Sequence, residues 1–266
     1  MITAASIFFA VILVMFTRSM QLGSYEHIVH NALSRYTGFV QVHGKGFWDD
    51  RSLDRSMAPP DTLRERIASL PHVTHVVPRL ETFALASSGA RTRGTLVMGI
   101  DPRAEQEMNQ LDNRLVSGEY LKPGEKRALI EKELARYLRL TAGDTLLLIG
   151  QGYYGSSAAG AYVIAGIVDV ATRQMGGELV YLPLREAQWM LSAGDRITSL
   201  SIMIDDSRAQ AETENAVRRL APPGYEVMGW REMLPEMVQW IEIDNAGGVL
   251  MLAILYIVVG FGMFGT

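Results

Sequence analysis

The sequence predicts an α+β protein in which a large polar body is flanked by one apolar segment at each end. Three observations lead to this class. All charged residues of the 266-residue chain lie between Arg18 and Asp244. Within that stretch, helical periodicity alternates with strand-like runs. The order β-α-β occurs near the start of the polar body and again near its end, and two such halves commonly pair into a ferredoxin-like fold.

Composition excludes several classes of protein. With 48% hydrophobic and 20% charged residues, the chain is neither disordered nor of low complexity. The net charge of −4 argues against a broad basic surface for nucleic acid. The absence of cysteine excludes disulfides, thiolate metal sites and cysteine nucleophiles.

The two apolar ends predict membrane spans. Residues 246–266 are uncharged over about the length that a bilayer core needs; a helix buried in an oligomer is the alternative. Because they end without a polar flank, we expect this span to be cut and the natural protein to continue. Residues 2–16 fit an uncleaved span, with its first residues lost, better than a signal peptide.

Stalk helices are expected to extend both spans into water, over residues 17–34 and 231–245. The first span and its stalk would form one helix of about 33 residues, or roughly 50 Å. Pro235 falls in the first turn of the second helix, where proline is tolerated. The predicted divisions are a first span and stalk (1–35), a porter-like part (36–100 and 196–230), an inserted β-rich subdomain (101–195), and a second stalk and span (231–266).

The porter-like part is expected to hold the two β-α-β halves. In the first half, a strand (36–43), a loop (45–60) and a helix that Asp61 caps and that ends at Pro71 precede a strand hairpin (73–87 and 94–101). In the second half, a strand (199–205), an amphipathic helix (207–221) and a strand (225–230) follow one another.

The inserted part is expected to be rich in strands, with a few helices. It contains a capped helix (101–111), a strand that passes into a helix (128–140), two strands (143–151 and 161–170), and a strand followed by a helix (179–194).

Phosphate-binding motifs receive little support. Residues 150–155, GQGYYG, match G-x-G-x-x-G, but a strand-like run follows where a dinucleotide site needs a helix, so a glycine-rich hairpin is favoured. No G-x-x-x-x-G-K-[ST] motif occurs, so any ATP hydrolysis would belong to a partner.

The side chains that could bind a metal or act in catalysis are better explained by structural roles. The pairs His27/His30 and His72/His75 lack a well-spaced acidic third ligand, so we predict no metal site. The pairs Asp49/Asp50, Asp205/Asp206 and Glu131/Glu133 are better explained as caps and solvated faces than as catalytic carboxylates. We therefore predict no catalytic residues, no cofactor-binding residues and no enzyme activity in this chain.

Two apolar features are candidates for contact with other chains. Trp189, Trp230 and Trp240, together with Met228, Met233 and Met237, form either a contact surface or ordinary core. Small residues in the second span favour close packing against other spans; they are Gly247, Gly248, Gly260, Gly262 and Gly265.

The chain resembles the MacB/FtsX-like permeases of ABC transporters, a group that includes lipoprotein-releasing permeases. The resemblance covers essentially the whole chain. It rests on the order and spacing of six runs: TGFVQVHGKGFWDD, VMGIDPRAE, LVSGEYL, ALIEKELARYLRLTAGDTLLL, AYVIAGIVD and VVGFGMFGT.

This resemblance implies a multi-pass inner-membrane protein of four spans with a large periplasmic core domain. It also implies a partner ATPase that binds ATP and Mg²⁺, a second permease copy or paralogue, and a periplasmic carrier or adaptor as a further candidate partner. The loops at 44–60 and 150–160 are the candidates for carrier recruitment. The substrate would be a lipoprotein or a hydrophobic compound. A membrane-tethered sensor or interaction module without an ATPase is the alternative.

Overall fold

The computed structural model describes residues 2–35, 37–170 and 178–264. The chain divides into two units, which are described separately. One unit is helical and contains residues 1–36 and 230–266; the other contains residues 37–229.

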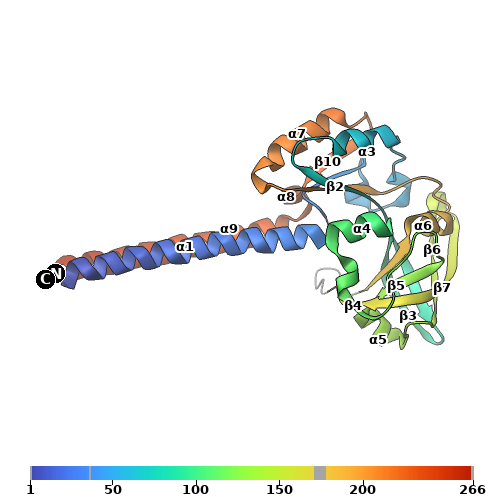
Figure 1. Ribbon diagram of the computed structural model, residues 1–266, viewed down its shortest axis with the longest axis horizontal. Coiled ribbons are helices and arrows are strands. Elements are labelled where there is room, and N and C mark those ends of the chain that lie inside the picture. The colour runs from blue at the N-terminus through green and yellow to red at the C-terminus, as the bar shows by residue number, and fades with distance from the viewer. Residues whose placement is uncertain (1, 36, 171–177, 265–266) are drawn as a thin grey trace. The chain divides into compact units, whose positions relative to one another are not determined.

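The helical unit is built from α1 (Ile2–Arg35), α8 (Trp230–Met233) and α9 (Pro235–Phe264). The predicted long first helix is confirmed, because α1 runs unbroken for 34 residues. Helix α9 begins at Pro235, where the missing N–H costs no helical hydrogen bond. The two long helices lie side by side (Figure 1).

Residues 37–229 begin with the first predicted β-α-β half. This half consists of β1 (Val40–Gly44), α3 (Asp61–Ala68) and β2 (Val73–Ser88), and it continues into β3 (Arg91–Ile100). Two expectations here were wrong in detail. Pro60, held extended by its ring, takes the N-cap position, so Asp61 is the first helical residue. The stretch expected as loop holds the short helices α2 (Phe47–Asp50) and η1 (Leu53–Arg55).

The second half follows the prediction closely. It contains β9 (Ser199–Ile204), the short helix η5 (Ser207–Ala209), α7 (Gln210–Leu220) and β10 (Tyr225–Gly229). Strand β1 lies between β10 and β9, and β9 pairs in turn with β2; all three pairings are antiparallel. The order β10-β1-β9-β2 is that of a ferredoxin-like sheet, as predicted. Helices α3 and α7 contact each other beside it (Figure 1).

The middle of the chain is rich in strands, as expected, with one short strand that the sequence did not reveal, β4. The elements are α4 (Pro102–Asn109), η2 (Leu111–Arg114), β4 (Leu115–Gly118), β5 (Arg127–Glu131), α5 (Lys132–Leu138), β6 (Thr145–Gln151), η3 (Tyr153–Gly155), β7 (Ser157–Val168), β8 (Leu179–Pro183) and α6 (Leu184–Met190).

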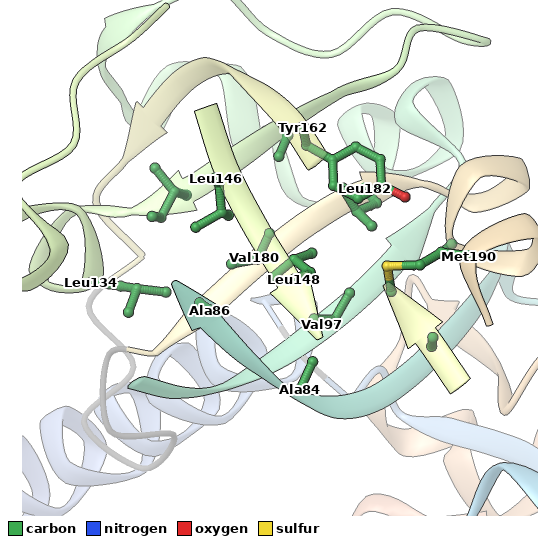
Figure 2. Close-up of a cluster of buried hydrophobic side chains, with 14 of the residues drawn as sticks. Ala84, Ala86, Val97, Leu134, Leu146, Leu148, Tyr162, Val180, Leu182 and Met190 are labelled. Carbon is green, nitrogen blue, oxygen red and sulfur yellow. The ribbon is translucent and has the colours of Figure 1, made fainter. Parts of the chain in front are cut away.

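Six strands close into a barrel. The circuit runs β2-β3-β8-β5-β7-β6 and returns to β2, because β6 pairs with both β7 and β2. Alternate residues point inward and fill the interior with a buried apolar cluster (Figure 2). Tyr162 belongs to this cluster, and burial raises the pKa of its hydroxyl to about 12.

Strand β2 is shared by the ferredoxin-like sheet and the barrel. Residues 73–79 of β2 pair with β9, and residues 84–87 pair with β6 along the same edge. Thr198 occupies the point of divergence: its hydroxyl donates to the Arg79 carbonyl at 3.1 Å and accepts the Glu81 N–H at 2.9 Å. The proposed boundary between porter-like and inserted parts stays a prediction.

A buried ion pair lies at the same point of β2. The fully buried guanidinium of Arg79 donates to both carboxylate oxygens of Glu105 on α4, with Nε 3.0 Å from Oε2. Asn109 donates to the same carboxylate. The carboxylate of Glu105 raises the pKa of Arg79 against the opposing effect of burial. This pair fastens α4 to the strand that both sheets share.

Replacing one partner of the buried pair should strongly destabilise the protein. Glu105→Gln leaves the Arg79 charge buried without its counter-charge, and we expect a loss of about 3–5 kcal/mol in the free energy of unfolding. The combined substitution Arg79→Met and Glu105→Leu should recover most of this loss, because neither member of the pair then carries a buried charge. Urea unfolding followed by circular dichroism measures both.

A matched control is Glu214→Gln, which breaks a more exposed pair between Glu214 and Arg218 on α7. This change should cost less than about 1 kcal/mol. Equal costs for Glu105→Gln and Glu214→Gln would contradict the role assigned to the buried pair.

Candidate interaction site at the junction of two loops

The two loops singled out from the sequence, 44–60 and 150–160, lie against each other. The Tyr154 N–H donates to the Asp54 carboxylate at 2.8 Å, joining η3 to η1. Arg196 reaches both loops: its guanidinium donates to the Ser56 carbonyl at 2.8 Å and lies 4.5 Å from the ring centre of Tyr153. We call this region the loop junction and define it by residues 46–57, 152–156 and Arg196.

Two glycines allow the close backbone contacts that place these loops. A Cβ on Gly44 would lie 1.9 Å from the Arg55 carbonyl oxygen. A Cβ on Gly152 would lie 2.5 Å from the Leu191 carbonyl oxygen, which accepts the Tyr153 N–H. Any larger residue at either position would push a loop away, so glycine is needed here for space.

An aromatic and cationic cluster forms one side of the loop junction. The Arg51 guanidinium lies 3.6 Å from the ring centre of Trp48 and 3.8 Å from the Glu81 carboxylate on β2. His43 of β1 packs beneath, 5.4 Å from Trp48 and hydrogen-bonded to Gln41. Burial, assisted by the charge of Arg51, lowers the pKa of His43 to about 3, so this imidazole is neutral at physiological pH.

The chemistry of the loop junction suits recognition. Tyr154 is 76% exposed at the tip of the β6–β7 hairpin, while its backbone is tied to Asp54. Tyrosine, tryptophan and arginine are the side chains that most often dominate binding at protein interfaces. A fixed backbone that displays these side chains loses little conformational entropy on binding.

The structure places the other candidate motifs in structural roles. GQGYYG forms the end and turn of the β6–β7 hairpin, as predicted. The acidic pairs act partly as caps: Glu131 caps α5, and Asp206 caps η5. Asp50 lies 3.2 Å from Arg55, and Asp205 lies 2.9 Å from His72. Among the described residues, no three His, Asp or Glu side chains gather into a metal-binding group.

The tryptophans differ in their burial. Trp230 is buried, whereas Trp189 is 67% exposed beside Lys126 and Trp240 is 51% exposed on α9. Sequence reasoning missed Asp54, Glu81 and Arg196. Each acts on residues distant in the chain, and no local pattern marks such partners.

The helical unit has its own polar contact, close to where the apolar segments begin. Arg18 of α1 donates to the Asn245 side chain at 3.0 Å, and Gln21 donates to the Asp244 carboxylate at 2.8 Å. Gly248 of α9 packs against the side chain of Gln21. In the described parts of the chain, no helix combines the length and apolar character that a bilayer span requires. The membrane assignment of α1 and α9 therefore stays a prediction.

The chain matches one family model and several curated proteins. The family model of the MacB-like periplasmic core domain matches residues 2–220. Lipoprotein-releasing system transmembrane proteins LolC from two strains of Xylella fastidiosa, 9a5c and Temecula1, are each 23% identical over 203 residues. These matches cover 73% of this chain and 48% of each relative, so the chain spans about half the length of the curated relatives it matches.

Two solved structures share the fold. The extracellular domain of the noncanonic ABC-type transporter YknZ, from Gram-positive bacteria, aligns with a TM-score of 0.51 at 14% identity, covering 71% of this chain and 99% of that one. The periplasmic region of MacB from Actinobacillus actinomycetemcomitans gives the same TM-score and identity, covering 76% of this chain and 94% of that one.

The contact between the two loops can be tested with Asp54→Asn. The substitution removes the charge that the Tyr154 N–H donates to, so we expect the exchange of this amide to accelerate about tenfold. Hydrogen–deuterium exchange measures the effect. Glu212→Gln, at an exposed carboxylate on α7 of the same unit, is the control and should leave the exchange rate unchanged. An unchanged rate in Asp54→Asn would show that the contact does not hold the hairpin tip.

Burial of His43 predicts a pH dependence of stability. Below pH 6.5 the unfolded chain gains a proton at this imidazole, whereas the folded chain, with a pKa of about 3, does not. Stability present above pH 6.5 is therefore lost as the pH falls, with a limiting slope of about 1.4 kcal/mol per pH unit. Urea unfolding between pH 6.5 and 4.5 should show that the free energy of unfolding of His43→Gln depends less steeply on pH than that of the unmodified chain. The other titratable groups are present in both proteins, so the difference in slope reports His43. Equal slopes would contradict this assignment.

Proposed function

The chain belongs to the family of MacB-like periplasmic core domains, and we propose that it couples ATP-driven motion of a partner ATPase to work on a substrate at the periplasmic side of a membrane. The observation that supports this most directly is the match of the family model over residues 2–220, which includes the first long helix and most of the folded body. The chain thus contains the periplasmic core domain of an ABC transporter permease of the MacB and LolC type.

The helical unit supplies the mechanical element of this proposal. Helix α1 has 34 residues without interruption and is about 51 Å long at the usual rise per residue. The contacts Arg18–Asn245 and Gln21–Asp244 join it to α9, so that the two helices move as a pair. A stiff pair of helices transmits a tilt applied at one end to whatever is attached at the other.

The relatives and the exposed loops support the substrate class and the partners that we propose. Because the LolC relatives are named as parts of a lipoprotein-releasing system, a lipoprotein is one substrate we propose, and a hydrophobic compound is the other. The proposed partners are an ATPase subunit that carries ATP and Mg²⁺, and a second permease copy or a paralogue. A periplasmic carrier or adaptor would meet the loop junction. The proposed location is the bacterial inner membrane, crossed several times, and the chain itself would carry no catalysis.

Interrupting the stiffness of the helical unit tests this proposal. A flexible Gly linker inserted at residues 231–233, within α8, should abolish ATP-dependent release of a lipoprotein, or export of a hydrophobic compound, in proteoliposomes that contain the whole transporter. The reason is that a flexible joint transmits no tilt. Binding of the ATPase subunit, measured by co-purification, should persist.

An insertion of equal length in the turn between β2 and β3, at Gly89 and Ala90, is the control and should leave transport unchanged. Unchanged transport with the linker in α8 would contradict mechanical coupling. Failure of any ATPase to co-purify with the unmodified protein would instead favour a membrane-tethered sensor or interaction module.

A further inference from the structure

A surface pocket lies where two neighbouring strands of the barrel end. Strands β3 and β8 run parallel, and their last residues, Ile100 and Pro183, are register partners. Each strand passes almost directly into a helix, β3 into α4 and β8 into α6. The pocket has a volume of about 380 Å³, which is within the usual range for small-molecule sites. We call it the strand-end pocket and define it by its lining residues, 100–103, 123–124 and 183–185.

The walls of the strand-end pocket are rigid. Pro102 and Pro183 are buried in it, and their rings fix the backbone where each helix begins. The Tyr120 hydroxyl donates to the Pro102 carbonyl at 2.9 Å, which ties the segment before the third wall to α4. That wall is a turn closed between residues 122 and 125, and its third residue, Gly124, has a φ of 79° that glycine adopts without strain. A site formed in advance loses little conformational entropy when a ligand binds.

Two exposed arginines line the strand-end pocket. Arg103 is the second residue of α4, and Arg185 is the second residue of α6. Among the described residues, neither guanidinium has a hydrogen-bond or ion-pair partner. A positive side chain in the first turn of a helix is also opposed by the helix dipole. Contacts within the folded chain therefore do not explain why two arginines share this pocket.

Nearby carboxylates do not neutralise the two arginines. Asp101 lines the pocket, but its Oδ1 accepts the N–H groups of Arg103 and Ala104 at 3.0 and 3.2 Å and so caps α4. Glu125, which follows the third wall, lies 3.9 Å from the guanidinium of Arg127. With two guanidinium groups and one ionised carboxylate, the described lining of the pocket carries a net positive charge.

We propose that the strand-end pocket binds a phosphate group, held by the side chains of Arg103 and Arg185. The planar guanidinium group donates two parallel hydrogen bonds to a phosphate. A phosphate monoester has three terminal oxygens, one more than a carboxylate, so it suits two arginines at once. The floor of the pocket, formed by Ile100, Pro183 and Leu184, is apolar and suits the carbon skeleton attached to the phosphate.

Two sources could supply this phosphate group, and the same chemistry recognises both. One is inorganic phosphate or a soluble phosphate ester, and the other is the headgroup of a phospholipid. The inference goes beyond the proposed function and does not depend on it, because binding at the strand-end pocket needs neither an ATPase nor a transported substrate. The pocket also shares no residue with the loop junction.

Titration of the full-length protein with inorganic phosphate tests the proposal. The protein is held in phosphatidylcholine nanodiscs at low ionic strength, and binding is measured by isothermal titration calorimetry. We expect saturable binding of one phosphate per chain. Arg103→Gln combined with Arg185→Gln should weaken this binding at least about tenfold, because charge-assisted hydrogen bonds are lost. Thermal unfolding checks that the double variant is folded, as expected for changes at exposed positions.

The matched control is Arg64→Gln combined with Arg219→Gln. These arginines are exposed on α3 and α7, away from the lining of the pocket, and their replacement changes the net charge by the same amount. The control variant should bind phosphate as tightly as the unmodified protein does. Equal affinities in the unmodified protein and in the Arg103/Arg185 double variant would overturn the proposal.

A second titration distinguishes the two sources. Dihexanoyl phosphatidic acid, a water-soluble lipid, carries the same phosphate monoester as part of a phospholipid. Binding at least about tenfold tighter than that of inorganic phosphate, and lost in the double variant, would support a phospholipid headgroup as the source. Affinity no greater than that of inorganic phosphate would support free phosphate.

Failure of both probes to bind saturably would overturn the phosphate site and leave the proposed function unaffected. The proposed function is tested separately, by co-purification of an ATPase with the same full-length protein. If no ATPase is retained and phosphate binds as expected, the proposed coupling is wrong and the strand-end pocket remains a phosphate site.

Discussion

The arrangement of residues 37–229 depends on one strand, β2, and on the charged pair buried beside it. A strand of 16 residues that serves two sheets must change partners midway, and the change leaves backbone groups that neither sheet satisfies on its own. Thr198 satisfies two of these groups. Arg79 and Glu105 hold α4 against the same point. Since an unpaired charge there would be costly, the pair favours the one arrangement in which both partners meet.

This constraint explains how surface features distant in sequence come to lie together. Continuation of β2 from one sheet into the barrel carries Glu81 next to Arg51, and Phe83 and Leu85 next to β6. The hairpin tip then reaches Asp54, which is 100 residues away in the chain. The loop junction and the exposed apolar side chains of Phe83 and Leu85 are therefore both positioned by the same strand.

Local structure could be predicted well from the sequence, whereas the long-range contact that closes the barrel could not. Periodicity and turn residues predicted the ferredoxin-like halves, the long first helix and the strand-rich middle. The closing contact of the barrel, between residues 84–87 and 147–150, depends on packing across the interior and leaves no mark in either segment. The loops 44–60 and 150–160 were identified as candidates, but nothing in the sequence indicated that they touch. The exposed apolar side chains of Leu85, Leu147 and Ile149 could not be told from core residues until the closed barrel showed which side of each strand faces inward.

Closure of the barrel also limits how another chain can attach. In the described strands, the path of the sheet ends at β4 and β10, which have four and five residues. Such short edges give an incoming strand few unpaired N–H and C=O groups to extend the sheet. Strand addition, which can lead to edge-to-edge aggregation, is thereby disfavoured. Recognition by another chain is thus left to side chains on the outside of the sheet, on the helices and in the loops.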